Sequence, residues 1–284
     1  MKKNKLDIKK IIKKRIEYRQ SKLVPIKKRN VQMNNRDRLR NNYDENVQLI
    51  DVELTNRNEI RTGVKEVLIK NKKVNVIISA FDCAEYIEEC LDSISLQTYK
   101  CKKILLGIDG CKKTLQKIQE IRQKYVNLEV YYSEENNGPY QMFNALMMLV
   151  PDDEYIQRFD ADDVMNPNML ENMVKNDTPA ISRHHGMLFF NKKIINGVGG
   201  FRDWKCAADS DIIMRLNFLP NIKVKILPKY FFRREHEKQL TVREETNRSS
   251  VLRKNYETII ENNGKSENPI IYITPTCSVI KIIL

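Results

Sequence analysis

Residues 155–163 read Tyr-Ile-Gln-Arg-Phe-Asp-Ala-Asp-Asp, so that an apolar segment ends in three aspartates within four positions. Three carboxylates on one loop repel one another unless a cation joins them. Hard divalent ions such as Mg²⁺ and Mn²⁺ bind a few carboxylates and keep positions open for phosphate oxygens, and an Asp-x-Asp turn offers that arrangement. The run therefore indicates a site for a metal and a diphosphate at the end of a strand.

A second interpretation of the same run is purely structural. Asp163 or Asn166 would cap a following helix that has Pro167 at its first position, because Asp and Asn side chains accept hydrogen bonds from the free N–H groups of a first helical turn. The spacing alone leaves both interpretations open. The elements that surround the run are needed to choose between them.

The chain before the aspartates alternates between strand and helix patterns. Apolar runs predict strands at 74–78, 104–108 and 128–132, and apolar residues three or four positions apart predict helices near 87–94, 115–125 and 143–150. Short links between such elements favour right-handed crossovers and a mostly parallel sheet flanked by helices. The loops at 79–82, 109–110 and 160–163 would then meet at one edge, where open sheets bind ligands.

The second half of the chain shows shorter patterns. Strands are predicted at 187–190, 222–227 and 230–233, and helices at 212–219 and around 252–256. The last apolar stretch, 270–284, is expected to be a strand or a docking segment, because it is shorter than the run of about 18 residues that crosses a bilayer. The sequence contains neither Gly-x-Gly-x-x-Gly nor Gly-x-x-x-x-Gly-Lys, which argues against a dinucleotide or P-loop site.

The net positive charge is confined to the N-terminus. Residues 1–40 hold sixteen Lys and Arg against three Asp and Glu, and the rest of the chain holds 34 of each sign. A neutral domain with a basic arm is not typical of a dedicated nucleic-acid-binding protein. In the arm, Ile8, Ile11, Ile12 and Ile16 recur at helical spacing. The arm is expected either to lie as an amphipathic helix on an anionic membrane or an acidic partner, or to be a solvated tail.

Composition divides the chain into three parts: a basic arm and polar linker at 1–72, a main domain at 73–245, and a C-terminal helix with an apolar tail at 246–284. The six cysteines have no Cys-x-x-Cys spacing, so they are expected to be reduced packing residues. The sequence has no apolar signal-peptide core at its start. We therefore expect a cytoplasmic protein that is peripheral to a membrane if the arm binds one.

Several short motifs follow one another in a recognisable order. Residues 76–82 read Val-Ile-Ile-Ser-Ala-Phe-Asp, and 97–99 read Gln-Thr-Tyr. After them come Ile108-Asp109-Gly110, Asn136-Asn137-Gly138, Asp160-Ala161-Asp162-Asp163, Gly199-Gly200-Phe201 and Asp209-Ser210-Asp211. This order resembles the family 2 glycosyltransferases, which are inverting enzymes of the GT-A fold, over about residues 74–245. Such a fold is a Rossmann-like, mostly parallel sheet flanked by helices, here with a basic N-terminal extension.

The resemblance implies the metal-dependent transfer of a sugar from a nucleotide-sugar, usually a UDP-sugar, to a hydroxyl of a glycan, lipid-linked or protein acceptor. It implies that Asp209 is the general base, with Asp211 as the second candidate, and that Asp162 and His236 hold Mn²⁺ or Mg²⁺. The residues implied for nucleotide-sugar binding are Ser79, Ala80, Phe81, Asp109, Asn137, Gly138, Arg158, Asp160 and Ala161.

The sequence departs from the family pattern at several positions. Ile108 replaces an aspartate of the Asp-Asp-Gly turn, and Ala208 replaces a glutamate before Asp209. Phe143 occupies a position where the family often has an arginine, and Arg158 is the nearby residue that would supply positive charge instead. These changes affect the expected roles of individual residues more than the expected fold.

Three other classes of protein remain open at this level. A nucleotidyltransferase also uses paired aspartates and a metal, although it normally needs a glycine-rich triphosphate loop that this sequence lacks. A non-catalytic glycan- or nucleotide-binding module would have the same groove, with Asp209 only as a helix cap. A nucleic-acid-binding protein would depend on the basic arm, and nucleic acid is not an expected partner of the neutral domain.

Overall fold

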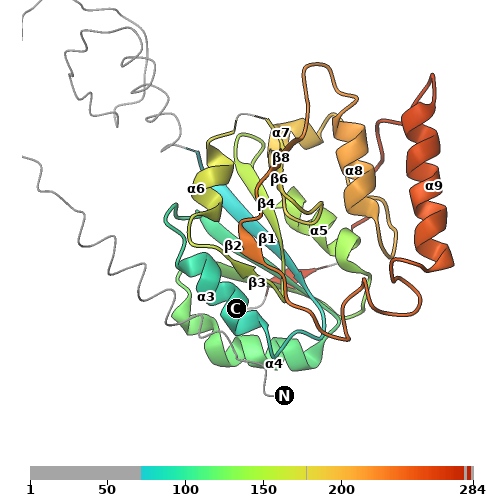
Figure 1. The fold of residues 1–284 in the computed structure, drawn as a ribbon. Coiled ribbons are helices and arrows are strands. Elements are labelled where there is room, and N and C mark those ends of the chain that lie inside the picture. The colour runs from blue at the N-terminus through green and yellow to red at the C-terminus, as the bar shows by residue number, and fades with distance from the viewer. Residues whose placement is uncertain (1–71, 177, 278–279, 283–284) are drawn as a thin grey trace, which may run out of the picture. The chain divides into compact units, whose positions relative to one another are not determined.

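The structure is a computed structural model that describes residues 72–176, 178–277 and 280–282. The basic arm at 1–40 and the linker up to residue 71 lie outside the described residues, as do the expectations attached to them. No helix in the described ranges is long and apolar enough to cross a membrane. Figure 1 shows the described part of the chain as a central sheet with helices on both of its faces.

Almost uninterrupted apolar runs form the central strands. The described residues contain an eight-stranded sheet in the order β10-β3-β2-β1-β4-β7-β6-β8. The strands are β1 (Val74–Ala80), β2 (Lys103–Asp109), β3 (Leu128–Ser133), β4 (Tyr155–Asp160), β6 (Ala180–Ser182), β7 (Leu188–Asn191), β8 (Lys225–Leu227) and β10 (Lys281–Ile282). β1 pairs in parallel with β2 and β4, and β2 with β3, whereas β7 and β10 pair antiparallel with β4 and β3. The predicted mostly parallel sheet is confirmed.

All but the last of the α-helices pack on the two faces of this sheet; the last one contacts the helix before it, and none of its residues is buried. The helices are α3 (Ile87–Ser95), α4 (Lys112–Ile121), the 3₁₀ turn η1 (Arg122–Lys124), α5 (Pro139–Met148), α6 (Met169–Val174), α7 (Lys192–Ile195), α8 (Ala208–Leu216) and α9 (Val251–Lys265). Apolar residues of α3, α4 and α6 belong to one buried cluster, and those of α5, α7 and α8 belong to the other. The sheet thus separates two cores.

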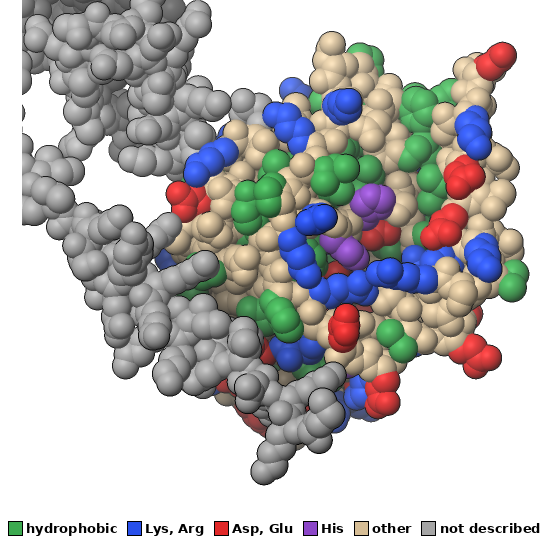
Figure 2. Space-filling model, viewed as in Figure 1, with side chains coloured by type: hydrophobic (Ala, Val, Ile, Leu, Met, Phe, Trp, Pro, Cys, Tyr) green, Lys and Arg blue, Asp and Glu red, His purple; other side chains and the backbone are tan. Residues whose placement is uncertain are grey.

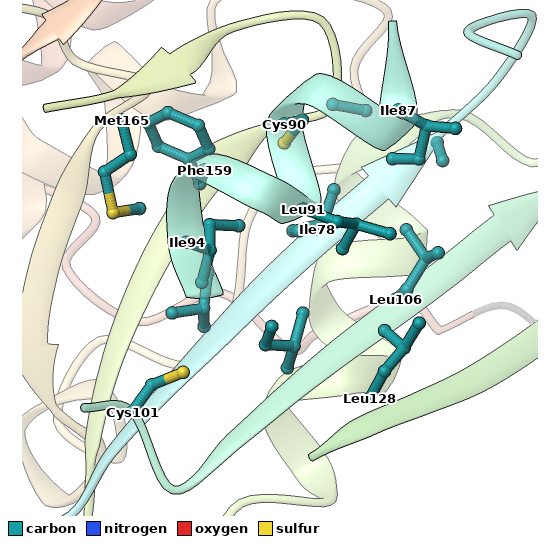
Figure 3. Close-up of a cluster of buried hydrophobic side chains, with 14 of the residues drawn as sticks. Ile78, Ile87, Cys90, Leu91, Ile94, Cys101, Leu106, Leu128, Phe159 and Met165 are labelled. Carbon is teal, nitrogen blue, oxygen red and sulfur yellow. The ribbon is translucent and has the colours of Figure 1, made fainter. Parts of the chain in front are cut away.

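Both cores receive side chains from β1, because successive residues of a strand point to opposite faces. Val76 and Ile78 pack with Leu91 of α3, while Ile77 packs on the other face with Leu146 of α5. Figure 3 shows the first cluster, in which Ile78 and Leu91 lie together between the helix and the sheet. The apolar positions that predicted α3 are therefore the ones that attach it to the sheet.

A glycine in β2 allows α5 to approach closely. Gly107 is part of a strand, and a Cβ atom at this position would overlap the sulfur of Met142 in α5. A strand interior normally disfavours glycine, so its presence here is explained by the contact rather than by backbone conformation. The close contact holds α5 against the strands that end in the ligand-binding loops.

The segment after the aspartates differs from the predicted helix cap. A short strand, β5 (Val164–Met165), follows at once and pairs with β9 (Phe231–Phe232), and α6 begins only at Met169. Asp163 accepts a hydrogen bond from the backbone N–H of Arg234, at 2.9 Å, and caps no helix. The capping interpretation of the aspartate run is therefore wrong.

The apolar tail docks on the main domain as a strand and an extended segment. Ile273 forms a parallel bridge with Gly199, and Lys281 and Ile282 of β10 pair with Tyr132 and Tyr131 of β3. Both alternatives expected for residues 270–284, a strand and a docking segment, are realised in different parts of it. The tail thereby continues the sheet beyond β3.

Candidate active site

The carboxyl ends of β1, β2 and β4 meet at one edge of the sheet and form the floor of a cleft of about 530 Å³. Ligand pockets usually measure about 300–1,000 Å³, so the cleft has room for a small-molecule ligand. All three histidines of the chain line it. Figure 2 looks onto this face and shows Lys and Arg side chains gathered around histidines. The predicted convergence of the loops at 79–82, 109–110 and 160–163 is confirmed.

The cleft brings together most of the residues predicted from the sequence. Those that line it are Ser79, Phe81, Asp109, Arg158, Asp160, Ala161, Asp162, Asp209 and His236. Four predicted residues do not line it: Ala80, Asn137, Gly138 and Asp211. Each of these four has a structural explanation.

Ala80, Asn137 and Gly138 have structural surroundings that keep them out of the cleft. Ala80 is fully buried in the core between β1 and α3. The backbone N–H groups of Asn137 and Gly138 donate to the two carboxylate oxygens of Asp109, at 2.9 and 2.8 Å. Burial raises the pKa of Asp109, and these two hydrogen bonds oppose that effect. Asp109 therefore holds the loop that precedes α5. The residues on either side of Asn137 and Gly138, which are Asn136 and Pro139, line the cleft instead.

Arg158 is almost completely buried beneath the aspartates. Its guanidinium lies 4.3 Å from the centre of the Phe143 ring and 3.1 Å from the Asp160 carboxylate, and it donates to the backbone oxygen of Gly186. A side chain at Gly186 would overlap Arg158, so the glycine makes room for this arrangement. Phe143 stands where the family often has an arginine, and Arg158 contacts its ring. Arg158 thus supplies positive charge next to the position where Phe143 supplies none.

Asp162 and His236 form a close pair although they are 74 positions apart. The pairing of β5 with β9 carries the chain from Phe232 back to the aspartate loop, so that His236 Nε2 lies 2.8 Å from Asp162 Oδ2. The ring of His236 rests 4.7 Å from that of Tyr86, and its buried Nδ1 has no hydrogen-bond partner within the described residues. One carboxylate and one imidazole at this separation can bind a single divalent ion together.

The aspartate loop carries charge that the protein does not fully neutralise. Burial raises the pKa of Asp160, and it raises the pKa of Asp163 to about 8 together with repulsion from the carboxylates of Asp160 and Asp162. A cation next to these groups removes the repulsion. In the described ranges, no cluster of three or more His, Cys, Asp and Glu side chains is arranged to hold a metal by itself. An ion bound here would take its remaining ligands from phosphate oxygens and water.

Asp209 lies at the start of α8, with its side chain in the cleft. Ala207, two positions before Asp209, has a left-handed backbone with φ of 64°. This conformation is costly for alanine, and it sets the direction in which α8 begins. The carboxylate accepts from the Ser210 N–H at 3.0 Å and lies 3.4 Å from the Tyr140 hydroxyl. The N-cap residue is Ala207, so Asp209 does not serve as the cap.

Asp211, predicted as the second candidate for the general base, does not have the surroundings of a base. It is fully buried, and its two oxygens bind Arg202 Nε at 2.9 Å and Arg215 Nε at 2.7 Å. Arg215 in turn donates to the backbone oxygens of Val198 and Gly200. A carboxylate committed to two arginines is not available to take a proton from a ligand. Asp211 fixes α8 to the glycine-rich segment at 197–201 instead.

The sequence reasoning did not identify the basic residues of the cleft wall. Arg183, His184 and His185 line it from the loop between β6 and β7, and Arg233, Arg243, Arg248 and Arg253 line it from the C-terminal part. His185 Nδ1 lies 2.7 Å from the Ser210 hydroxyl, next to Asp209. The Arg-His-His run was the available signal, but β6 is only three residues long and left no strand pattern to place it.

The mostly parallel sheet, with carboxylates at the ends of β1, β2 and β4, fits the GT-A fold that the motif order implied. The chain belongs to glycosyl transferase family 2: the model of the family described as "Glycosyl transferase family 2" matches residues 75–260, which is more than half of the 284 residues. The resemblance drawn from the motif order is confirmed. The matched range includes both aspartate segments and His236.

Individual relatives share only part of their length with this chain. An uncharacterized glycosyltransferase of Haemophilus influenzae is 31% identical over 109 residues, which cover 37% of this chain and 33% of that protein. The poly(ribitol-phosphate) beta-N-acetylglucosaminyltransferase TarS of Staphylococcus aureus is 29% identical over 131 residues, which cover 45% of this chain and 22% of TarS. The matched segment is thus a third or less of these relatives.

A comparison with solved structures agrees on the fold. The crystal structure of S. aureus TarS residues 1–349 in complex with UDP-GlcNAc superposes with a TM-score of 0.50 at 19% sequence identity. The superposition covers 59% of this chain and 60% of that one. At this identity the likeness establishes a shared architecture.

Proposed function

We propose that this protein is a metal-dependent, inverting glycosyltransferase that moves a sugar from a UDP-sugar to a hydroxyl group of an acceptor. The observation that carries the proposal is the make-up of one cleft. It holds the Asp162–His236 pair, which suits a divalent ion, and the Asp209 carboxylate, which suits a general base. The acceptor would be a glycan, a lipid-linked molecule or a protein.

The donor would bind over the ends of β1, β2 and β4. Asp109, Ser79 and Phe81, which line the cleft, would contact the base and ribose, and Asp160 would also contact the nucleoside. Asp162 and His236 would hold the ion that joins the diphosphate. A mixed oxygen and nitrogen donor set favours Mn²⁺ over Mg²⁺, which prefers oxygen alone. When bound, such an ion neutralises the charge that develops on the leaving diphosphate.

Asp209 would act on the acceptor. As the acceptor oxygen forms its bond to the anomeric carbon, the bond from that carbon to the diphosphate oxygen breaks, and the hydroxyl proton passes to the Asp209 carboxylate. Attack from the face opposite the leaving group inverts the configuration. The Ser210 N–H and the Tyr140 hydroxyl orient the carboxylate. The buried guanidinium of Arg158 forms an ion pair with Asp160 and keeps the Asp160 carboxylate in place.

The alternatives are less well supported. A nucleotidyltransferase does not fit the family to which the chain belongs. A binding module in which Asp209 is only a helix cap does not fit the position of Ala207 as the N-cap residue. TarS is named as an N-acetylglucosaminyltransferase, and its structure contains UDP-GlcNAc, so this donor is the first to test.

The experiment is to measure nucleotide release from UDP-, GDP- and dTDP-sugars in the presence of Mn²⁺, Mg²⁺ or EDTA. We expect release from one UDP-sugar that requires a divalent ion and disappears in Asp162→Ala. Metal-dependent UDP binding without release means that the acceptor is missing from the assay. The absence of both release and metal-dependent UDP binding would favour a non-catalytic binding module.

A further inference from the structure

Three arginines line the cleft around the position of Asp209. Arg183 belongs to the loop that also carries His185, which contacts Ser210. Arg253 lies in the first turns of α9, and Arg248 lies in the segment just before that helix. Cys206 lines the same cleft; burial raises the pKa of its thiol, Arg253 opposes that rise and Asp209 adds to it. Both charged groups therefore act on one residue of the cleft.

These arginines have no acidic partner, a property that they share with Arg233 and Arg243 of the same cleft, whose side chains donate to the Thr241 hydroxyl and the Lys238 backbone oxygen. Arg158, Arg202, Arg215 and Arg234 form ion pairs with Asp160, Asp211, Asp211 and Glu89, respectively. Within the described part of the chain, Arg183, Arg248 and Arg253 form none. Arg253 uses only its Nε, which donates to the backbone oxygen of Thr246 at 3.0 Å. Unpaired guanidinium groups in a cleft are available for an anionic ligand.

The backbone at Arg183 gives a second indication. Its φ is 52°, in the left-handed region that a residue with a long side chain rarely adopts. Strain of this kind is maintained at functional sites more often than elsewhere. Here it belongs to an exposed arginine that lines the cleft. The loop between β6 and β7 and the start of α9 thus bring positive charge into the same cleft as Asp209 from two separate segments of the chain.

The donor already has its own contacts. Its diphosphate would be bound at the Asp162–His236 pair, and Arg243 lies over the ring of Phe81, with 5.8 Å between the guanidinium and the ring centre, on the donor side. One carboxylate, Glu257, lines the cleft one turn beyond Arg253 and reduces the positive charge there. The three arginines outnumber it. Their charge is therefore left for the second substrate.

We infer that the acceptor carries a phosphate or carboxylate group, which Arg183, Arg248 and Arg253 bind while the reacting hydroxyl lies at Asp209. This inference rests on the proposed glycosyl transfer and specifies the acceptor. The planar guanidinium matches both kinds of anion through two parallel hydrogen bonds. An uncharged acceptor would leave the charge of the three arginines only partly compensated by the carboxylates of Glu257 and Asp209.

The test is calorimetric titration of the full-length protein, saturated with Mn²⁺ and UDP, with glycerol 3-phosphate, glucuronic acid and glycerol. We expect at least one charged probe to bind and glycerol not to bind, and the stronger charged probe identifies the anionic group. Arg248→Gln and Arg253→Gln should each weaken that probe about tenfold and leave the affinity for UDP unchanged. Lys254→Gln, which removes the same charge from the exposed side of α9, should change neither affinity.

The inference is overturned if glycerol binds as well as the charged probes, if no charged probe binds, or if the arginine variants weaken UDP as much as the probe. The side chain of Arg248 is exposed and forms no hydrogen bond or ion pair within the described residues, so Arg248→Gln tests the site without disturbing the fold. Failure of the wild-type protein to bind UDP would contradict the proposed function instead. The probes, titrated without UDP, would then still decide whether the arginines bind anions.

Discussion

Asp209 and Asp211 are two positions apart in α8 and have opposite surroundings. Asp209 lines the cleft, whereas Asp211 is fully buried between two arginines. Two positions correspond to a rotation of about 200° around a helix, so that one side chain faces the cleft and the other faces the core. The two residues are therefore expected to respond to substitution in different measurements.

Replacement of Asp209 should affect the reaction and little else. Asp209→Asn keeps the size of the side chain and removes its basicity, so turnover should fall about 10²- to 10⁴-fold, the usual contribution of a general base. Affinity for UDP should be unchanged, because the proposed donor position is over the strand ends and does not include Asp209. Asp203→Asn is the matched control, since Asp203 is exposed and outside the cleft. Full turnover by Asp209→Asn would exclude this residue as the base.

Replacement of Asp211 should affect stability first. Asp211→Ala leaves Arg215 buried without its charge partner, which typically costs about 3–5 kcal/mol. Chemical denaturation should detect a loss of this size in the free energy of unfolding. Asp209→Asn, at a partly exposed position, should change it by less than about 0.5 kcal/mol. Equal stability losses in the two variants would contradict the different surroundings described here.

The residue scale also shows where sequence reasoning succeeds. The motif order assigned Asp162 and His236 to one ion, and the structure puts their side chains 2.8 Å apart. The motif order did not show that Asn137 and Gly138 lie outside the cleft. Their backbone N–H groups bind Asp109, and a pattern of side chains does not record a backbone contact. The roles of the residues that line the cleft stay predictions.

At the scale of elements, α3 shows how one apolar face attaches a helix to the sheet. Leu91 is fully buried in the core between α3 and β1, whereas Leu96, just beyond the end of the helix, is 45% exposed. Leu91→Ala should lower the free energy of unfolding by about 2–5 kcal/mol, since it removes buried methyl groups and leaves a cavity. Leu96→Ala is the control and should cost far less. Similar losses in the two variants would contradict this packing.

The regular elements were predictable because their patterns are local. The predicted strands at 74–78, 104–108 and 128–132 correspond to β1, β2 and β3, each extended by one or two residues. β9 lies within the predicted strand at 230–233, but β5 and β6 are two and three residues long, so their formation depends on pairing with distant strands rather than on periodicity. The pairing of β5 with β9 brings His236 to the cleft, and β6 leads into the loop of Arg183. These pairings could not be placed from local sequence.

At the scale of the whole molecule, charge is divided between a basic arm and a neutral remainder. Sixteen basic residues within 40 positions favour anionic membranes by about 1 kcal/mol for each residue that reaches the surface. We expect the full chain to co-sediment with vesicles that contain phosphatidylserine, and a chain lacking residues 1–40 to stay in the supernatant. Vesicles of phosphatidylcholine alone are the control. Equal sedimentation with and without the arm would contradict a membrane role for it.

The fold as a whole was accessible because the alternation of strand and helix restricts the chain to a mostly parallel sheet. The loops at 79–82, 109–110 and 160–163 follow the carboxyl ends of neighbouring strands, and they therefore meet at one cleft. The tail could not be placed in the same way. Its main contacts with Gly199, Gly200 and Asn144 go through backbone groups of Ile273 and Thr276, which any residue could provide.

The most direct test of the account is calorimetric titration of UDP into the protein with Mn²⁺ and with EDTA. We predict that binding requires Mn²⁺ and that Asp162→Ala weakens it at least about tenfold, or about 1.4 kcal/mol. Asp153→Ala, at an exposed aspartate outside the cleft, should bind UDP like the wild type. Binding of UDP that is equally strong in EDTA and in Asp162→Ala would contradict a metal and diphosphate site at the end of β4.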